Sequence, residues 1–108
     1  MLELKLDTSK ENEYEKYDKY KIGCYEVAVV IHKQYNNMRI IQISNLKEKD
    51  GYEPDIYYND WSFVGKEKKF EIQTTSYGSL ERKEVQKLIA AYNTAIQIVE
   101  ILTEKFLA

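Results

Sequence analysis

The sequence contains very few of the residues on which disulfides and metal sites depend. Its 108 residues include one cysteine, Cys24, and one histidine, His32. A single cysteine excludes an internal disulfide, and a zinc-type site needs several converging histidine or cysteine ligands. We therefore expect no metal site and a reducing, cytoplasmic environment.

Glycine and proline are also scarce, with four glycines and one proline. Each glycine is isolated where a turn is expected, so no glycine-rich phosphate loop or nucleophile elbow is present. No apolar run approaches the roughly 20 residues that span a bilayer, and the charged, alternating first residues do not resemble a signal peptide. We expect no cofactor and no membrane segment.

Neither sign of charge dominates the chain. Sixteen basic residues oppose eighteen acidic ones, for a net charge of -2. Double-stranded nucleic acid binding usually requires a clear basic excess or stripe. The balance argues against nucleic acid as a partner.

The possible catalytic groups do not form a convincing set. Cys24 and His32 are separated by an expected strand, which places them roughly 26 Å apart, too far for a base to activate the thiol. Asp50, Glu53, Asp55 and Asp60 form an acidic loop whose spacing does not match a calcium-binding loop. A solvated loop is favoured over a pair of acid and base carboxylates.

Two stretches predict a hairpin. Residues 25–33, Tyr-Glu-Val-Ala-Val-Val-Ile-His-Lys, are rich in β-branched side chains and put Tyr25, Val27 and Val29 on one face. Residues 38–44 continue as the partner strand. Asn36-Asn37 between them supplies the turn, because asparagine tolerates positive φ.

The remaining strands are expected at residues 2–7, 56–64 and 69–75, with turns at Asp50-Gly51 and Gly65 to Lys68. Short connections favour an antiparallel meander. Ser79 is a candidate N-cap for a helix that continues to about Leu107. The sequence thus predicts one α+β domain over residues 1–108: an antiparallel β-meander of four to five strands packed against one long C-terminal helix.

The N-terminal segment has no clear assignment. Tyr14, Tyr17 and Tyr20 recur at spacing three within a highly charged stretch. This spacing suits a short helix for two turns, and an extended arm is the alternative. Residues 1–21 are therefore a candidate flexible arm or lid.

The aromatic stretch after the acidic loop is the main candidate binding surface. If residues 56–64 form one strand, Tyr57, Trp61 and Phe63 lie on one face and Tyr58 on the other. One helix covers only one face, and exposed tyrosine and tryptophan side chains are common binding hot spots. The candidate contact residues are Tyr57, Tyr58, Trp61, Phe63, Lys66 and Lys68. The alternative is that residues 14–20 cover this face internally.

The helix carries a broad apolar arc toward its C-terminus. One stripe runs from Val85 to Phe106, and Ile98 and Ile101 widen it on one side. A single sheet does not cover so broad an arc, so we expect Ile98, Ile101 and Leu102 to mediate self-association as a homodimer. Packing of the N-terminal arm on this surface is the alternative.

The C-terminal helix and the residues that lead into it are similar in sequence to a known class of small proteins. The sequence Tyr-Gly-Ser-Leu at residues 77–80, followed by Val-x-x-Leu-Ile-x-x-Tyr at residues 85–92, resembles small proteins encoded by phages and prophages of AT-rich bacteria. The resemblance is mainly to residues 70–107 and transfers no active residue. It implies a small accessory protein that binds and inhibits a host protein.

These observations favour a non-enzymatic protein that acts through protein contacts, as a phage-encoded inhibitor or modulator of a host defence system. The alternative is a protein that binds or sequesters a nucleotide-like ligand between aromatic rings and the basic Lys66 to Lys69 turn. An enzyme that uses the acidic loop is the least favoured interpretation.

Overall fold

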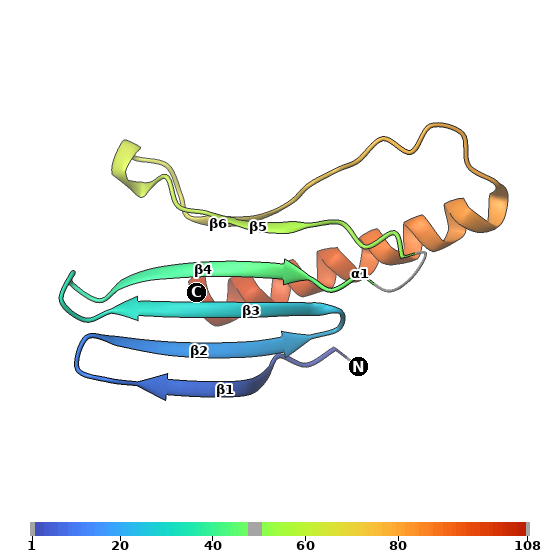
Figure 1. The fold of residues 1–108 in the computed structure, drawn as a ribbon. Coiled ribbons are helices and arrows are strands. Elements are labelled where there is room, and N and C mark those ends of the chain that lie inside the picture. Colours follow the sequence, from blue (N-terminus) through green and yellow to red (C-terminus); the bar gives the residue numbers. More distant parts are fainter. Residues whose placement is uncertain (1, 48–50, 108) are drawn as a thin grey trace. The chain divides into compact units, whose positions relative to one another are not determined.

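The computed structural model describes residues 2–47 and 51–107 and has an α+β fold, as predicted (Figure 1). Along the described residues the order is five strands, a short 3₁₀ helix, a sixth strand and one long C-terminal helix. The chain divides into two compact units, Met1–Leu46 and Lys47–Ala108. Among the described residues, no helix is both long enough and apolar enough to cross a membrane.

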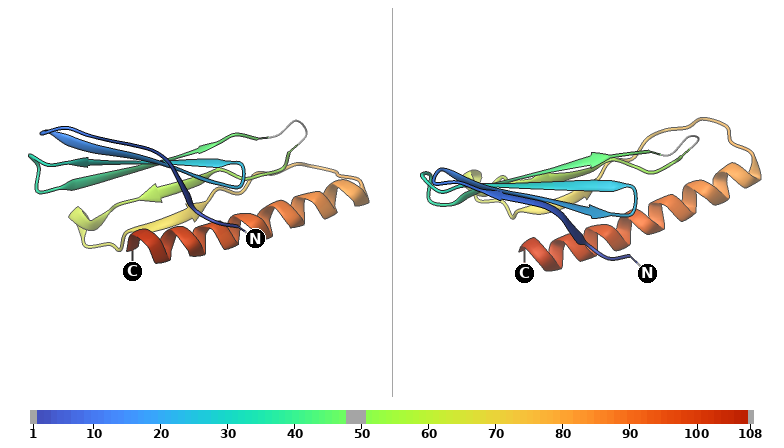
Figure 2. Two further views of the ribbon diagram at one scale, coloured as in Figure 1. Left: turned by 90° about the horizontal axis from the view of Figure 1, so that it is seen from below. Right: turned by 60° about the horizontal axis from the view of Figure 1, so that its bottom comes forward.

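The first unit is a four-stranded antiparallel meander. Its strands are β1 (Lys5–Glu11), β2 (Glu15–Ile22), β3 (Tyr25–His32) and β4 (Met38–Asn45), and they pair in chain order. They lie in one layer in both views of Figure 2. The predicted hairpin of β3 and β4 is confirmed, and Asn36 and Asn37 in its turn have φ of 55° and 56°.

Residues 8–21, which the sequence left open as helix, arm or lid, belong to the β1–β2 hairpin, and the strand expected at residues 2–7 is found at Lys5–Glu11. Tyr17 lies opposite Val30 and Tyr20 opposite Val27, so the tyrosines alternate between the two faces. One face of the sheet is buried, with Ile22, Tyr25, Val27, Val29 and Ile41 each at most 6% exposed. The predicted facing of Tyr25, Val27 and Val29 is confirmed.

The second unit combines a short hairpin with the helix. Strands β5 (Ile56–Asn59) and β6 (Lys69–Ile72) form a separate two-stranded antiparallel sheet. Helix α1 (Arg82–Leu107) packs along β6. The ring centroids of Phe70 and Phe106 are 6.5 Å apart, and the Thr75 amide donates to the Tyr92 hydroxyl at 3.2 Å. Since these contacts run in opposite order, α1 returns antiparallel to β6.

The helix begins later than expected. It starts at Arg82, so Ser79 is not its N-cap. The Val85 amide donates the first helical hydrogen bond to the Glu81 carbonyl at 3.0 Å, and Glu84 Oε1 accepts from the Glu81 amide at 3.2 Å. Glu84 thus satisfies a backbone donor that has no partner within the helix.

Candidate functional site

The candidate site is the connection between β5 and β6. The predicted strand over residues 56–64 ends at Asn59, and a 3₁₀ helix, η1 (Ser62–Val64), follows. Three backbone bonds of 3.0–3.1 Å close this turn: the amides of Val64 and Lys66 donate to the Trp61 carbonyl, and that of Gly65 donates to the Ser62 carbonyl. We call Trp61, Phe63 and Val64 the aromatic tip.

Asp60 organises the start of the turn. Its Oδ1 accepts a hydrogen bond from the Ser62 amide at 3.0 Å. Hydrogen bonding from the Ser62 side chain, and then from its backbone, holds the pKa of Asp60 below its ordinary value. An aspartate that bonds the amide two residues later mimics a backbone turn, so this short polar side chain stabilises the reversal.

Gly65 ends the turn in the left-handed region, with φ of 79°. Residues with a Cβ adopt this conformation only at a cost. Apart from the two adjacent residues, no atom lies within 4 Å of where a Cβ would be, so the requirement for glycine comes from the backbone and not from crowding.

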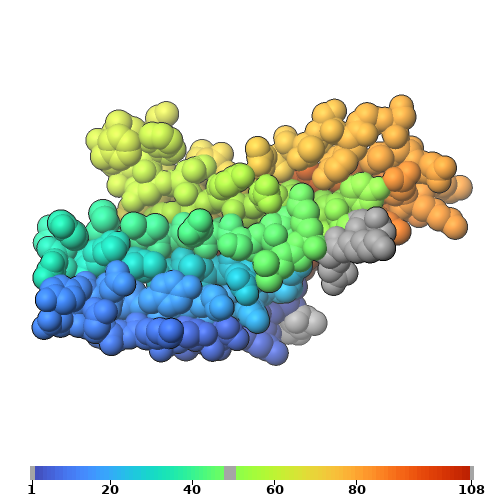
Figure 3. Space-filling view, in the orientation of Figure 1, coloured from blue at the N-terminus to red at the C-terminus, as the bar shows by residue number. Residues whose placement is uncertain are grey.

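The tip exposes a cluster of large apolar side chains. Trp61 is 49% exposed, Phe63 76% and Val64 57%. The rings of Trp61 and Phe63 are 5.6 Å apart and tilted by 43°. In Figure 3 the connection between β5 and β6, coloured yellow-green, projects as a rounded knob from the β5–β6 hairpin.

Charged groups of both signs surround the tip. One hollow, of about 380 Å³, is lined by Trp61, Lys66, Glu67, Lys69 and Glu71. A second hollow, of about 550 Å³, lies between the start of β6 and the end of α1 and includes Lys68, Phe70 and Leu107. The first lining carries two lysines and two glutamates, so it does not present a strongly cationic surface.

The structure brings together only part of the predicted binding set. Trp61 shares a hollow with Lys66, but Lys68 lines the other one. Tyr58 packs on Phe70, with ring centroids 5.2 Å apart, and is half-buried. Tyr57 is 47% exposed and its hydroxyl donates to Gln73 Oε1 at 3.1 Å.

The predicted alternation of Tyr57, Trp61 and Phe63 along one strand is wrong, because the chain leaves the strand at Asn59. Sequence reasoning also missed Val64 as part of the cluster and Asp60 as its organiser. The available signal was an aspartate two residues before Ser62, followed by an apolar pair and then Gly65.

The predicted exposure of Ile98 is wrong. Ile98 and Leu102 are 0% exposed and Ile101 is half-buried, whereas Val85, Ile89 and Ile96 are 39%, 55% and 48% exposed. Helix α1 therefore buries the row of Ala95, Ile98 and Leu102 and presents another apolar row to solvent. Ile98, Ile101 and Leu102 therefore do not form the predicted surface patch.

Cys24 and His32, the possible catalytic groups in the sequence, each contact a nearby polar side chain. Cys24 Sγ lies 3.7 Å from Asn45 Oδ1, and His32 Nδ1 lies 3.7 Å from Glu15 Oε2. His32 also meets the ring of Tyr35 edge-on. Within residues 2–47 and 51–107, no group of three or more histidine, cysteine or acidic residues could hold a metal ion. The predicted Asp50-Gly51 turn lies partly outside the described residues.

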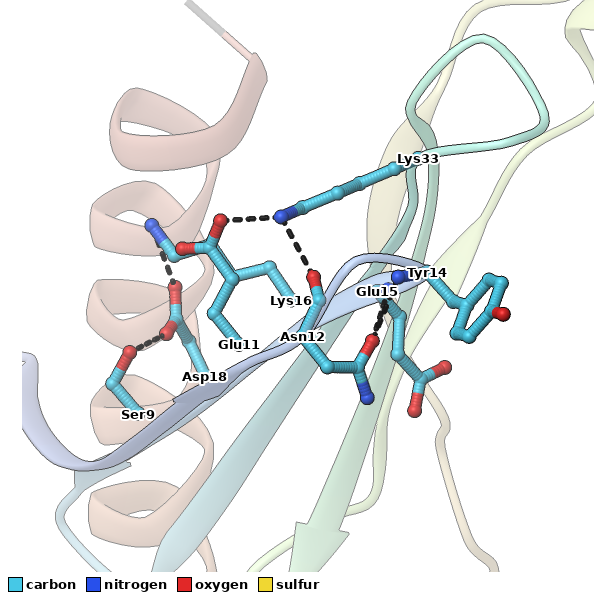
Figure 4. A network of polar contacts seen from close by, with 8 residues as sticks. All are labelled: Ser9, Glu11, Asn12, Tyr14, Glu15, Lys16, Asp18 and Lys33. Carbon is cyan, nitrogen blue, oxygen red and sulfur yellow. Dashed lines mark hydrogen bonds and ion pairs between the residues drawn. The ribbon is translucent and has the colours of Figure 1, made fainter.

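A polar network occupies the turn end of the first sheet (Figure 4). Lys33 Nζ donates to Glu11 Oε2 and, at 2.8 Å, to the Asn12 carbonyl, while Asn12 Oδ1 accepts from the amides of Tyr14 and Glu15. The Lys33 hydrogen bond holds the pKa of Glu11 below its ordinary value. These bonds tie the β1–β2 turn to the start of the β3–β4 turn, which is a structural role.

The fold and the tip together define an α+β protein with a preformed apolar surface. Comparison with known protein families, curated proteins and solved structures finds no match to this chain.

Proposed function

We propose that this is a non-enzymatic binding protein that engages another protein through the aromatic tip. The observation that supports the proposal is the exposure of Trp61, Phe63 and Val64 at one closed turn, with Phe63 76% exposed. Adjacent large apolar side chains on a surface mark interaction sites more often than isolated ones. Tryptophan is also among the residues most enriched in hot spots.

The turn is closed by hydrogen bonds within the chain itself. Asp60 holds the Ser62 amide, and backbone bonds from Val64, Gly65 and Lys66 close the tip. Ordering a loop on binding costs free energy, so a preformed turn retains more of its contact energy as affinity. The aromatic side chains are therefore presented in a form suited to insertion into a partner's pocket.

The charges around the tip favour a protein over nucleic acid. Three acidic residues balance the positive charge of three lysines around the apolar centre: Asp60, Glu67 and Glu71 against Lys66, Lys68 and Lys69. An apolar centre with a charged rim of both signs is the usual composition of a protein–protein contact. A phosphate backbone would instead favour a basic surface.

The identity and location of the partner are expectations from the sequence. The resemblance of residues 77–92 to small phage proteins favours a host protein as the partner, with inhibition or modulation as the outcome. The single cysteine favours action in the cytoplasm.

Photo-crosslinking tests the proposal directly. A photoreactive phenylalanine analogue replaces Phe63 in one variant and Tyr35 in a second, and both are irradiated in cells that naturally contain the protein. Tyr35 is a matched control because it is aromatic, 68% exposed and located in the β3–β4 turn. We expect one discrete protein adduct from position 63 and none from position 35.

The identified partner then allows a quantitative test. Trp61 is the only tryptophan of the chain, so its fluorescence reports on the tip itself. Phe63→Ser should weaken binding by about thirtyfold, which corresponds to a hot spot of roughly 2 kcal/mol. Adducts from both positions alike, or unchanged affinity in the variant, would refute binding through the tip.

A nucleotide-like ligand is the second candidate, because Trp61 and two lysines share one hollow. Its volume of about 380 Å³ is large enough for a small ligand, but Glu67 and Glu71 in the lining oppose an anion. Titration of Trp61 fluorescence with AMP and ATP separates the candidates. Saturable quenching that Lys66→Glu abolishes would support the ligand and oppose our proposal.

A further inference from the structure

Helix α1 has two apolar faces, of which only one is buried. Successive residues are about 100° apart around a helix, so Val85, Ile89 and Ile96 lie in one row. They are 39%, 55% and 48% exposed. The buried row of Ala95, Ile98 and Leu102 lies about 130° away around the helix. A solvent-facing row of three branched side chains is an unusual surface for a helix.

We propose that this row is a self-association surface on which a second copy of the chain packs antiparallel. The charges beside the row support this occupant. Arg82 and Glu100 are eighteen residues, or about five turns, apart, so they lie on the same flank of the row near its two ends. Glu104 is one turn beyond Glu100 on that flank.

A twofold axis perpendicular to the helices brings the same flanks of two copies together. If Ile89 packs on Ile96 of the second copy, the axis passes between residues 92 and 93. Arg82 then lies opposite position 103 of the second copy, between Glu100 and Glu104 of that copy. In this register Ile89 pairs with Ile96 and Arg82 meets acidic residues of the second copy, while Val85 at the end of the row lies opposite Glu100.

A parallel arrangement of the two helices does not pair Arg82 with Glu100 and Glu104. A parallel pair would put this flank of the two copies on opposite sides of the contact and would leave Arg82 about 27 Å along the helices from Glu100 of the second copy. The row from Val85 to Glu100 covers only about 23 Å of helix. A contact this short falls below the size of obligate interfaces, so we expect a reversible dimer at micromolar concentrations.

Sedimentation equilibrium between about 5 and 500 µM tests the association. The wild type should shift from monomer to dimer across this range. Ile96→Glu should raise the dissociation constant about tenfold or more, because it places a charge in the apolar contact. Ala90→Glu is the matched control: Ala90 is exposed, lies away from the row, and its replacement should leave the dissociation constant unchanged.

Crosslinking tests the antiparallel register. In a Cys24→Ser background, single cysteines at the exposed positions Asn93 and Gln86 are treated with a short bis-maleimide. Position 93 lies beside the proposed axis and should crosslink to its equivalent. The two copies of position 86 should be about 20 Å apart along the helices and should not react.

Each result decides the proposal. A wild type that stays monomeric to 500 µM, or an Ile96→Glu protein that dimerises like the wild type with an unchanged circular dichroism spectrum, would overturn it. Equal crosslinking at positions 86 and 93 would replace the antiparallel arrangement with a parallel one. These outcomes are independent of the aromatic tip, because no tip residue is changed.

Discussion

The hydroxyl of Tyr52 donates a hydrogen bond of 2.6 Å to Glu84 Oε2 and so joins the segment before β5 to the first turn of α1. The other oxygen of the same carboxylate accepts the Glu81 amide. The ring of Tyr52 also meets that of Tyr77 edge-on, at 5.3 Å. One glutamate therefore serves both as a helix cap and as the anchor of a distant segment.

Glu84→Gln should lower stability at neutral pH and lose this effect in acid. The Tyr52 hydrogen bond, followed by that of the Glu81 amide, holds the pKa of Glu84 below its ordinary value of 4.5. A pKa lowered by folding means that the ionised group stabilises the folded state above pH 4.5. This contribution disappears as the pH falls through the folded-state pKa.

Thermal unfolding at pH 7 and at pH 3 provides the measurement for Glu84. The wild type and the variant should differ at pH 7, and the difference should be smaller at pH 3, below the ordinary pKa of 4.5. Glu13→Gln, at an exposed carboxylate between β1 and β2, is the control and should melt like the wild type at pH 7. An equal difference for Glu84→Gln at both pH values would mean that its charge is not involved.

Ile98→Ala should lower the free energy of unfolding much more than Ile96→Ala, although both remove the same atoms from the same helix. Ile98 is 0% exposed and Ile96 is 48% exposed. Truncation of a buried isoleucine costs about 2–5 kcal/mol, whereas a surface change costs roughly 0.5 kcal/mol or less. Urea unfolding at low micromolar concentration measures both, and similar losses would contradict the assigned helix face.

Ser9→Ala should destabilise the protein by about 1–3 kcal/mol, because it removes a donor from a buried carboxylate. Asp18 is 9% exposed, and Ser9 Oγ donates to its Oδ1 at 2.5 Å. Lys16 approaches the other oxygen at 3.8 Å from a more exposed position. Lys16→Met should therefore cost less, roughly 1 kcal/mol at most. Chemical denaturation compares the two, and the reverse order would show that the ion pair is the stronger contact.

Gly65→Ala should cost about 1–2 kcal/mol through the backbone alone, since φ is 79° and no neighbour would collide with the new methyl group. Gly65→Asn should cost less, because asparagine visits the left-handed region more readily. Denaturation followed by Trp61 fluorescence reports both. Equal losses for alanine and asparagine would point to a cause other than φ.

The hairpin of β3 and β4 was predictable because local signals agreed. Alternating β-branched residues from Tyr25 to Ile31 set the strand, and Asn36-Asn37 set the turn. Strand β2 gave no such signal, since Glu15 to Lys21 is highly charged and its tyrosines recur every three residues. Its conformation comes from pairing with β3, a tertiary effect that overrides the local pattern.

The candidate site was predictable in composition but not in geometry. The alternating pattern of residues 56–64 predicts that Trp61 and Phe63 lie on a strand, whereas the strand ends at Asn59. Only the hydrogen bonds around Asp60 and Ser62 define where the strand ends. The buried face of α1 was not predictable from the sequence. Ile96 and Ile98 are equally apolar, and which one is buried depends on packing that periodicity does not encode.

The meander also determines the order in which the chain can fold during synthesis. All three ladders of the four-stranded sheet join consecutive strands between Lys5 and Asn45. Hairpins form in about 1–10 µs, whereas a ribosome adds roughly 5–20 residues per second. The nascent chain therefore carries a paired sheet for seconds before α1 exists. Because β1 and β4 are the edge strands of this sheet, their edges are open to other strands from that stage onward, and chaperones have their first opportunity to bind then.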